Sequence, residues 1–252
     1  MKKKNKISLI IPARYNSSRF PGKPLALILN KELILWVLEV CLKAVSKKFI
    51  TVATDDKRIF NFVKFKKFNV LMTPKNCLTG TDRIAFASKK INAEIYINVQ
   101  GDEPLINPAD IKLIINVKKK FPSYVICGCV KLKKNEKKKN LNIPKVIFNE
   151  KNELIYISRN LIPGSKNENL EIDFYKQVCI YAFNKDELNQ FFRFSRKSKL
   201  ESIEDIEILR FFEINKKIKM IEFKNQSLAV DTKQDIRKIE KFINYQKKRL
   251  KF

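Results

Sequence analysis

The sequence of 252 residues contains no histidine. This absence excludes a Ser-His-Asp triad, a histidine general base and metal sites with histidine ligands. Any chemistry must therefore use carboxylates, cationic side chains, hydroxyl groups and metal ions held by oxygen. The five cysteines are scattered, and none of them forms a C-x-x-C pair. This pattern is typical of reduced, mostly buried thiols in the cytoplasm rather than of a disulfide framework.

Long apolar runs are also missing, since no stretch approaches 18 consecutive apolar residues. The basic start at residues 1–6 leads into Ile7–Ile11, which is too short for the core of a signal peptide. We therefore expect a cytoplasmic protein without a membrane partner. The hydrophobic content of 44% is ample for a buried core.

Acidic residues are scarce: the chain has 26 of them and 53 lysines and arginines, which gives a net charge of +27. Two readings are open, a lysine-rich codon bias of an AT-rich genome and a selected surface for polyanions. The charge is spread from end to end, and the densest run, Lys133–Lys139, is typical of a solvated loop. Basic and aromatic residues do not alternate as in proteins that bind single strands. We expect no specific nucleic-acid partner, only weak nonspecific binding to polyanions.

Apolar runs typical of strands alternate with helical patterns, which predicts an α/β fold: a mostly parallel mixed sheet with helices on both faces. The predicted strands are Ile7–Ile11, Phe49–Ala53, Val70–Met72, Ile95–Val99, Tyr124–Val130, Val146–Phe148, Leu154–Ile157 and Lys176–Phe183. The predicted helices are Leu33–Val45, Ile59–Val63, Thr81–Lys90, Pro108–Lys119, Asp186–Phe194, Ile203–Ile214 and Lys233–Lys248. Because no linker or repeat divides the chain, we expect one domain over residues 1–252, with an excursion at about 130–182.

A turn-rich loop follows the first predicted strand and carries three cations, Arg14, Arg19 and Lys23. Small residues such as Ala13 and Gly22 let backbone N–H groups approach a ligand closely. Arginine offers paired donors to phosphate oxygens, and lysine offers a compact charge. A loop of this kind at the carboxyl end of a strand suits a triphosphate.

Two aspartates end apolar runs far apart in the sequence. Asp102 follows the predicted central strand, and Asp231 ends the run Leu228–Val230. Taken singly, Asp102 is also typical of a turn and Asp231 of a helix N-cap. Together with the basic loop, the two carboxylates could hold Mg²⁺ against phosphate oxygens.

These residues belong to motifs that resemble one family over nearly the whole chain and in family order. The matching segments are residues 11–25, Val52–Asp56, Thr79–Arg83, Asn98–Pro104, Ile157–Arg159 and Val230–Thr232. The chain is similar to the CMP-3-deoxy-manno-octulosonate (CMP-Kdo) synthetases, bacterial cytidylyltransferases that activate an acidic eight-carbon sugar for lipopolysaccharide.

The resemblance implies a Rossmann-like nucleotidyltransferase domain, usually a homodimer, that transfers CMP from CTP to the anomeric hydroxyl of Kdo with Mg²⁺. The excursion would bind the sugar and form the dimer. Catalytic roles would fall to Arg14, Lys23 and Asp102, and metal binding to Asp102 and Asp231. The nucleotide would contact Ala13, Arg14, Arg19, Lys23, Gly80, Thr81, Arg83 and Gln100. The sugar would contact Gln100, Arg159, Gln177, Tyr181, Glu207 and Arg210.

Two departures from the family pattern fall on the sugar side. Gln177 stands where the family commonly has histidine, and Ile208 replaces the glutamine of a Glu-Gln-Leu-Arg motif. Glu207 and Arg210 could still share a helix face, or could form a solvated ion pair within the helix. The acceptor therefore stays open between Kdo and another acidic 2-keto sugar of a surface polysaccharide. A basic nucleic-acid-binding protein is a remote alternative. It does not explain the motifs at Gln100–Pro104 and Val230–Thr232.

Overall fold

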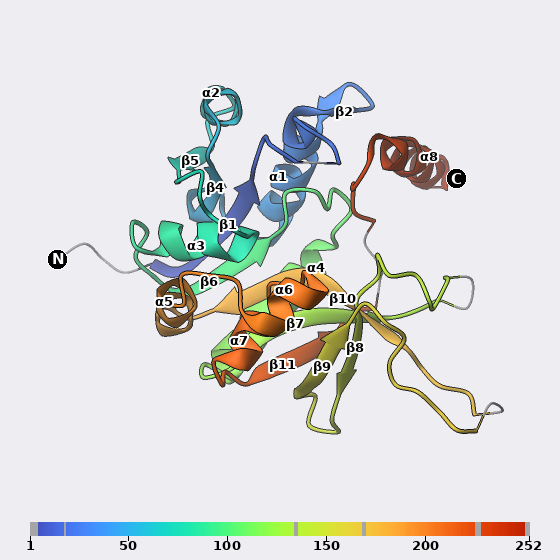
Figure 1. Cartoon of the computed structure of the whole chain (residues 1–252). Coiled ribbons are helices and arrows are strands. Elements are labelled where there is room, and N and C mark those ends of the chain that lie inside the picture. Colours follow the sequence, from blue (N-terminus) through green and yellow to red (C-terminus); the bar gives the residue numbers. More distant parts are fainter. Residues whose placement is uncertain (1–4, 18, 134–135, 168–169, 225–227, 250–252) are drawn as a thin grey trace.

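The computed structural model describes residues 5–17, 19–133, 136–167, 170–224 and 228–249 (Figure 1). A nine-stranded mixed sheet runs through the molecule, and its main path has the order β11–β7–β10–β6–β1–β4–β5. These strands are β1 (Asn5–Ala13), β4 (Ile50–Thr54), β5 (Asn69–Met72), β6 (Ala93–Val99), β7 (Val125–Lys131), β10 (Tyr175–Phe183) and β11 (Ile218–Glu222). All neighbours on this path are parallel except β10, which runs antiparallel between β6 and β7. The predicted α/β fold is confirmed.

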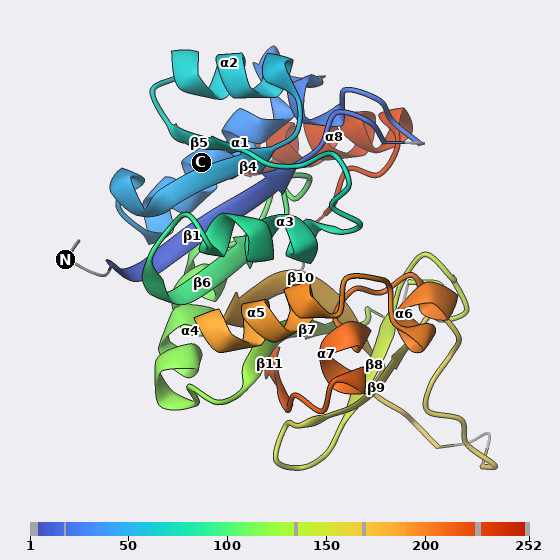
Figure 2. The ribbon, with the colours of Figure 1, turned by 60° about the vertical axis from the view of Figure 1, so that its left-hand side comes forward.

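Helices cover both faces of the sheet (Figure 2). One face packs against α1 (Leu33–Ala44), α2 (Lys57–Phe65) and α4 (Pro108–Lys120), and the other against α3 (Gly80–Ser88), α5 (Lys185–Arg193) and α7 (Leu209–Glu213). The central strands are apolar on both sides, since Leu9 and Ile11 enter the first core and Ile10 enters the second. Both cores exclude water completely at these positions.

Three further parts complete the fold. The hairpin β8 (Lys145–Phe148) and β9 (Leu154–Ser158) pairs with β10 and was predicted from the sequence. A two-stranded ribbon, β2 (Leu27–Ile28) and β3 (Lys31–Glu32), leads into α1. The last helix is α8 (Lys233–Arg249), labelled near the C-terminus in Figure 1, and it packs on this region through Ile239 and Ile243.

The predicted helix Ile203–Ile214 is wrong, because the chain breaks there. The structure has α6 (Lys199–Glu204) and α7, separated by a turn in which Asp205 has a φ of 50°. Ile206 in that turn is buried, and because it lies three residues from both Ile203 and Leu209, the helical pattern continues across the break. Strand β11 was not predicted, because its alternation of apolar residues with Lys219 and Glu222 spans only five residues.

The start of α3 also differs slightly from the prediction. Gly80 is the first residue of the helix, and Thr79 is its N-cap. The Thr79 side chain accepts a hydrogen bond from the Asp82 amide at 3.2 Å, and Asp82 accepts one from the Thr79 amide at 2.9 Å. This capping box fixes the first turn of the helix.

Within the described residues, no helix combines the length and apolar character needed to cross a membrane.

One buried carboxyl gives the fold a pH dependence. Asp110 in α4 is only 9% exposed, and burial raises its pKa to about 6 from its ordinary 3.8. The folded protein therefore holds the proton of Asp110 more tightly than the unfolded chain does. Its contribution to stability is fully present below about pH 4 and is lost as the pH rises through about 6.

We expect Asp110→Asn, which cannot ionise, to be more stable than the parent protein by about 1–2 kcal/mol near pH 8 and equally stable near pH 4. Urea unfolding at the two pH values measures the difference. Glu94→Gln at an exposed position of β6 is the matched control and should show no such trend. An Asp110→Asn effect of the same size at both pH values would contradict the assignment.

Candidate active site

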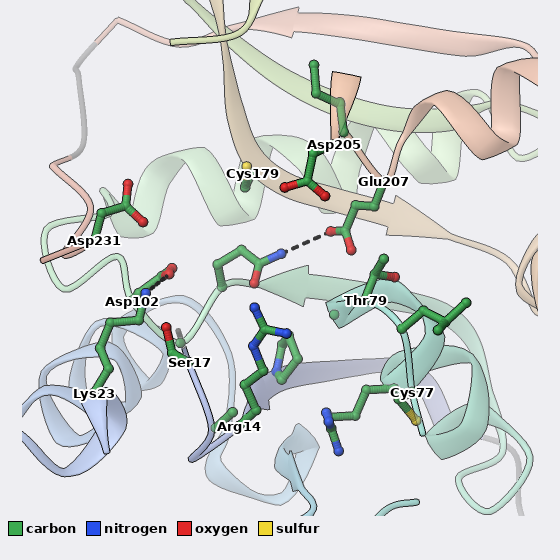
Figure 3. A pocket seen from close by; sticks show the side chains of 18 of the residues that line it. Arg14, Ser17, Lys23, Cys77, Thr79, Asp102, Cys179, Asp205, Glu207 and Asp231 are labelled. Atoms are coloured by element: carbon green, nitrogen blue, oxygen red, sulfur yellow. Dashed lines mark hydrogen bonds and ion pairs between the residues drawn. The ribbon is translucent and has the colours of Figure 1, made fainter. Parts of the chain in front are cut away.

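A cavity of about 360 Å³ opens at the carboxyl ends of β1 and β6. Its walls come from the loop after β1, the turn after β6, the N-terminus of α3, the start of β10 and the turn between α6 and α7. In Figure 3, Lys23, Asp102 and Asp231 lie at one end, Glu207 and Asp205 lie across from them, and Arg14 lies between. Open α/β sheets bind ligands at this edge.

The loop after β1 is folded back on itself by a tight turn. Gly22 has a φ of 73°, a left-handed conformation that residues with a side chain rarely adopt. Its amide donates to the Tyr15 carbonyl at 2.8 Å. The Tyr15 ring lies against Gly22, and the Arg58 guanidinium covers it, with its Cζ 3.2 Å from the ring centroid. This packing holds the loop so that Arg14 and Lys23 both line the cavity.

Two ion pairs occupy the basic end of the cavity. Lys23 Nζ lies 2.6 Å from Asp102 Oδ2 and donates to the Val230 carbonyl at 2.9 Å, and Arg19 Nη2 lies 2.9 Å from Asp231 Oδ1. The Val230 amide donates to the Asp102 carbonyl at 2.8 Å, so the segment before α8 is fixed beside the turn after β6. That turn also needs close backbone approach, because a Cβ at Gly101 would lie 2.9 Å from the Pro12 carbonyl oxygen.

The donor set at this end has the chemistry that Mg²⁺ prefers. Asp102 and Asp231 supply carboxylates to the same cavity. In the part of the chain that the structure describes, no group of three or more acidic or cysteine side chains could hold a metal ion. Mg²⁺ in nucleotide sites usually takes one or two carboxylates and completes its shell with phosphate oxygens and water. The two aspartates therefore fit a magnesium–nucleotide complex.

The carboxylate of Glu207, a half-buried residue, organises the middle of the cavity. Glu207 Oε1 accepts from Gln100 Nε2 at 3.0 Å, which is the dashed line that reaches Glu207 in Figure 3, and Oε2 accepts from the Thr81 amide at 2.9 Å. The pKa of Glu207 is raised on balance, because the effect of burial exceeds the opposing effect of the hydrogen bond from the Thr81 amide. Gln100 in turn lies against Gly80, where a Cβ would sit 3.3 Å from its Nε2.

The far end of the cavity combines cationic and polar side chains. Arg159 donates to the carbonyls of Leu141 and Asp205 at 3.0 and 3.1 Å, and Lys197 Nζ lies 2.7 Å from Asp205 Oδ1. The Lys197 hydrogen bond is the main reason that the pKa of Asp205 is lowered. On β10, Gln177 donates to the Tyr181 hydroxyl at 3.0 Å. Burial raises the pKa of Tyr181 well above its ordinary value, so the hydroxyl stays protonated.

Comparison with known proteins places this site in a family. The family model described as "Cytidylyltransferase" matches residues 8–218. The chain belongs to the cytidylyltransferase family. The predicted resemblance to the CMP-Kdo synthetases is confirmed by this match together with the relatives described next, which cover 93–96% of the chain.

Individual relatives agree with this membership. The chain is 34% identical to the 3-deoxy-manno-octulosonate cytidylyltransferase of Protochlamydia amoebophila, with 93% of each chain covered. It is 39% identical to the 8-amino-3,8-dideoxy-manno-octulosonate cytidylyltransferase of Shewanella frigidimarina, over 93% of this chain and 97% of that one. A solved CMP:2-keto-3-deoxy-manno-octonic acid synthetase complexed with CTP superposes with a TM-score of 0.87 at 32% identity, over 96% of this chain and 100% of that chain.

This cytidylyltransferase brings most of the predicted site residues into one cavity. Those that line it are Ala13, Arg14, Arg19, Lys23, Gly80, Arg83, Gln100, Asp102, Arg159, Gln177, Tyr181, Glu207 and Asp231. Arg83 is nearly buried, and its Nη2 lies 2.8 Å from Asp55 Oδ2, so most of its charge is already paired. The roles assigned to these residues stay predictions.

Two predicted contacts are not available in this structure. Thr81 is fully buried and reaches the site only through its amide. Arg210 was expected to face the sugar, but it is fully buried and does not line the cavity. The break between α6 and α7 is the physical reason: it turns Glu207 into the cavity and leaves Arg210 in the core.

Several residues that line the cavity were not predicted from the sequence. Lys197 and Asp205 form an ion pair at the far end, and Cys77 and Cys179 also line the cavity. Lys197 gave no signal among so many lysines, and Asp205 was hidden within a predicted helix. Its acidic side chain between two predicted helical turns was the available clue to a break, since aspartate tolerates positive φ better than most residues.

Proposed function

We propose that the protein transfers CMP from CTP to the anomeric hydroxyl of Kdo, giving CMP-Kdo and pyrophosphate for lipopolysaccharide biosynthesis. The observation that carries this proposal is one cavity with two differently built ends. Three cations and two aspartates line the end that suits a magnesium triphosphate, and Arg159, Lys197, Gln177 and Tyr181 line the end that suits a hydroxylated acid.

The chemistry follows from these charges. The sugar hydroxyl attacks the α-phosphorus of CTP and loses its proton to solvent water, and the bond to the leaving pyrophosphate breaks. Arg14 and Lys23 would neutralise charge on the phosphates as it shifts toward the leaving group. To do so, Lys23 exchanges Asp102 for a phosphate oxygen. Asp102 and Asp231 would hold Mg²⁺, which when bound supplies further neutralisation of phosphate charge.

A second acceptor is supported by specific observations. Relatives named for the 8-amino sugar reach 39% identity, and the far end of the cavity carries the Asp205 carboxylate. A carboxylate suits an ammonium group on the acceptor, whereas Lys197 and Arg159 suit its carboxylate. We keep the 8-amino sugar as the alternative to Kdo.

The proposal includes a homodimer formed through the excursion at about 130–182. In such a dimer a second copy would cover the exposed Ile155 (51%) of β9 and Ile203 (69%) of the neighbouring α6. Sedimentation of the purified protein measures this state.

Incubation of the purified protein with CTP, Mg²⁺ and Kdo should release pyrophosphate, measured with a coupled phosphate assay. The same assay with the 8-amino sugar compares the two acceptors through their kcat/KM values. Turnover of the amino sugar alone would replace the Kdo assignment. Absence of pyrophosphate release with either acid would overturn the proposed function.

A further inference from the structure

Glu207 is held between the two halves of the site by contacts on both of its sides. Its two carboxylate oxygens accept from Gln100 Nε2 and from the Thr81 amide at 3.0 and 2.9 Å. Its own carbonyl accepts from the Arg210 amide at 3.2 Å. The Arg210 guanidinium contacts Asp82 of α3 at 2.7 Å, so the turn that carries Glu207 is bound to the helix that carries Thr81. The carboxylate is therefore fixed in place.

This position dictates the orientation of the Gln100 amide. An ionised carboxylate only accepts hydrogen bonds, so Gln100 must turn its NH₂ group toward Glu207. The amide also lies against Gly80, where a Cβ would sit 3.3 Å from Nε2 and 3.4 Å from Oε1. The Gln100 NH₂ group is therefore bonded to Glu207, and the Gln100 carbonyl oxygen makes no hydrogen bond with Glu207.

We propose that Glu207 is a positioning residue that fixes Gln100 as a hydrogen-bond acceptor and so selects a ligand that brings an N–H or O–H donor to this point of the cavity. The inference rests on the proposed function, which offers two such donors: the 4-amino group of cytosine and a hydroxyl of the sugar. UTP carries an acceptor in place of that amino group. A site that presents a fixed acceptor would reject it, because a buried acceptor facing an acceptor stays unpaired.

The substitution Glu207→Gln should reverse this polarity. The Thr81 amide still needs an acceptor, so the new side chain turns its oxygen toward Thr81 and its NH₂ toward Gln100. Gln100 then rotates its carbonyl toward residue 207 and its NH₂ into the cavity. Shape and volume are kept, while the acceptor becomes a donor.

We expect Glu207→Gln to lower the preference for CTP over UTP by about tenfold or more, measured as the ratio of their kcat/KM values and of their Kd values from calorimetry. An unchanged nucleotide ratio with a KM for the sugar raised by about tenfold assigns the donor to the sugar hydroxyl instead. If the nucleotide ratio and the sugar KM both stay unchanged, Glu207 does not set the polarity of the site and the inference is overturned.

Two further variants separate positioning from a structural role. Glu213→Gln is the matched control, because Glu213 also accepts from two donors, Ser198 and Leu200, but does not line the cavity. It should leave the CTP to UTP ratio unchanged. In a Gln100→Leu background, Glu207→Gln should have no further effect on that ratio, and an effect of the same size as in the parent would contradict action through Gln100.

Calorimetry measures nucleotide binding without turnover, so a failure of this inference can be distinguished from a failure of the proposed function. Parent protein that binds CTP better than UTP but transfers CMP to no sugar contradicts the proposed reaction, while the Kd ratio still tests Glu207. Parent protein that binds CTP and UTP equally well overturns the nucleotide arm, and the sugar KM then decides.

Discussion

Asp102→Asn is expected to lower kcat/KM by about a thousandfold, since neutralisation of phosphate charge supplies several kcal/mol to reactions of this kind. The Asp102 carboxylate lies 2.6 Å from Lys23 Nζ and shares the cavity with Asp231. An amide keeps the shape but loses the charge that would hold Mg²⁺. Steady-state pyrophosphate release and a Mg²⁺ titration of CTP binding measure the loss.

The fold should tolerate this change. The Asp102 side chain is 29% exposed, and a partly exposed ion pair contributes about 1 kcal/mol or less. The turn is held independently by the bond between the Val230 amide and the Asp102 carbonyl. Glu39→Gln, which breaks the exposed pair between Lys31 of β3 and Glu39 of α1, is a matched control that should keep full activity. Near-normal turnover of Asp102→Asn would remove this residue from the metal site.

The basic end of the site was predictable from the sequence because of how parallel strands are arranged. The runs that form β1 and β6 are apolar and short, and their carboxyl ends must meet at one edge of the sheet. Whatever follows each strand is then brought together, which is how Lys23 and Asp102 become neighbours although 79 positions separate them. Local pattern and topology were enough here.

The far end of the site was less predictable because it depends on contacts that no local pattern reports. The partners of Arg210 include Asp82, which lies 128 positions away. Without that pair, the i, i+3 spacing of Ile203, Ile206 and Leu209 favours a continuous helix. Burial of Arg210 and the left-handed turn at Asp205 are tertiary effects that override the helical pattern.

Arg210→Met is expected to cost about 3–5 kcal/mol of unfolding free energy, because removing one partner leaves buried charges uncompensated. The Arg210 guanidinium is fully buried, 2.7 Å from Asp82 Oδ1 and 2.6 Å from Glu201 Oε2. Urea unfolding measures the loss. Arg19→Met, which breaks the exposed pair with Asp231, is the matched control and should cost about 1 kcal/mol or less.

The pH dependence of the Arg210→Met loss identifies its cause. Without the guanidinium, the carboxylates of Asp82 and Glu201 are buried without their counter-charge, and protonation would remove that uncompensated charge. The variant therefore loses stability as the pH increases, and its difference from the parent should be larger near pH 8 than near pH 5. Adding Glu201→Gln should recover part of the loss, because it neutralises one stranded charge. A loss that is equal at both pH values and unchanged by Glu201→Gln would assign the effect to packing against Phe191, whose ring centroid lies 3.8 Å from Arg210 Cζ.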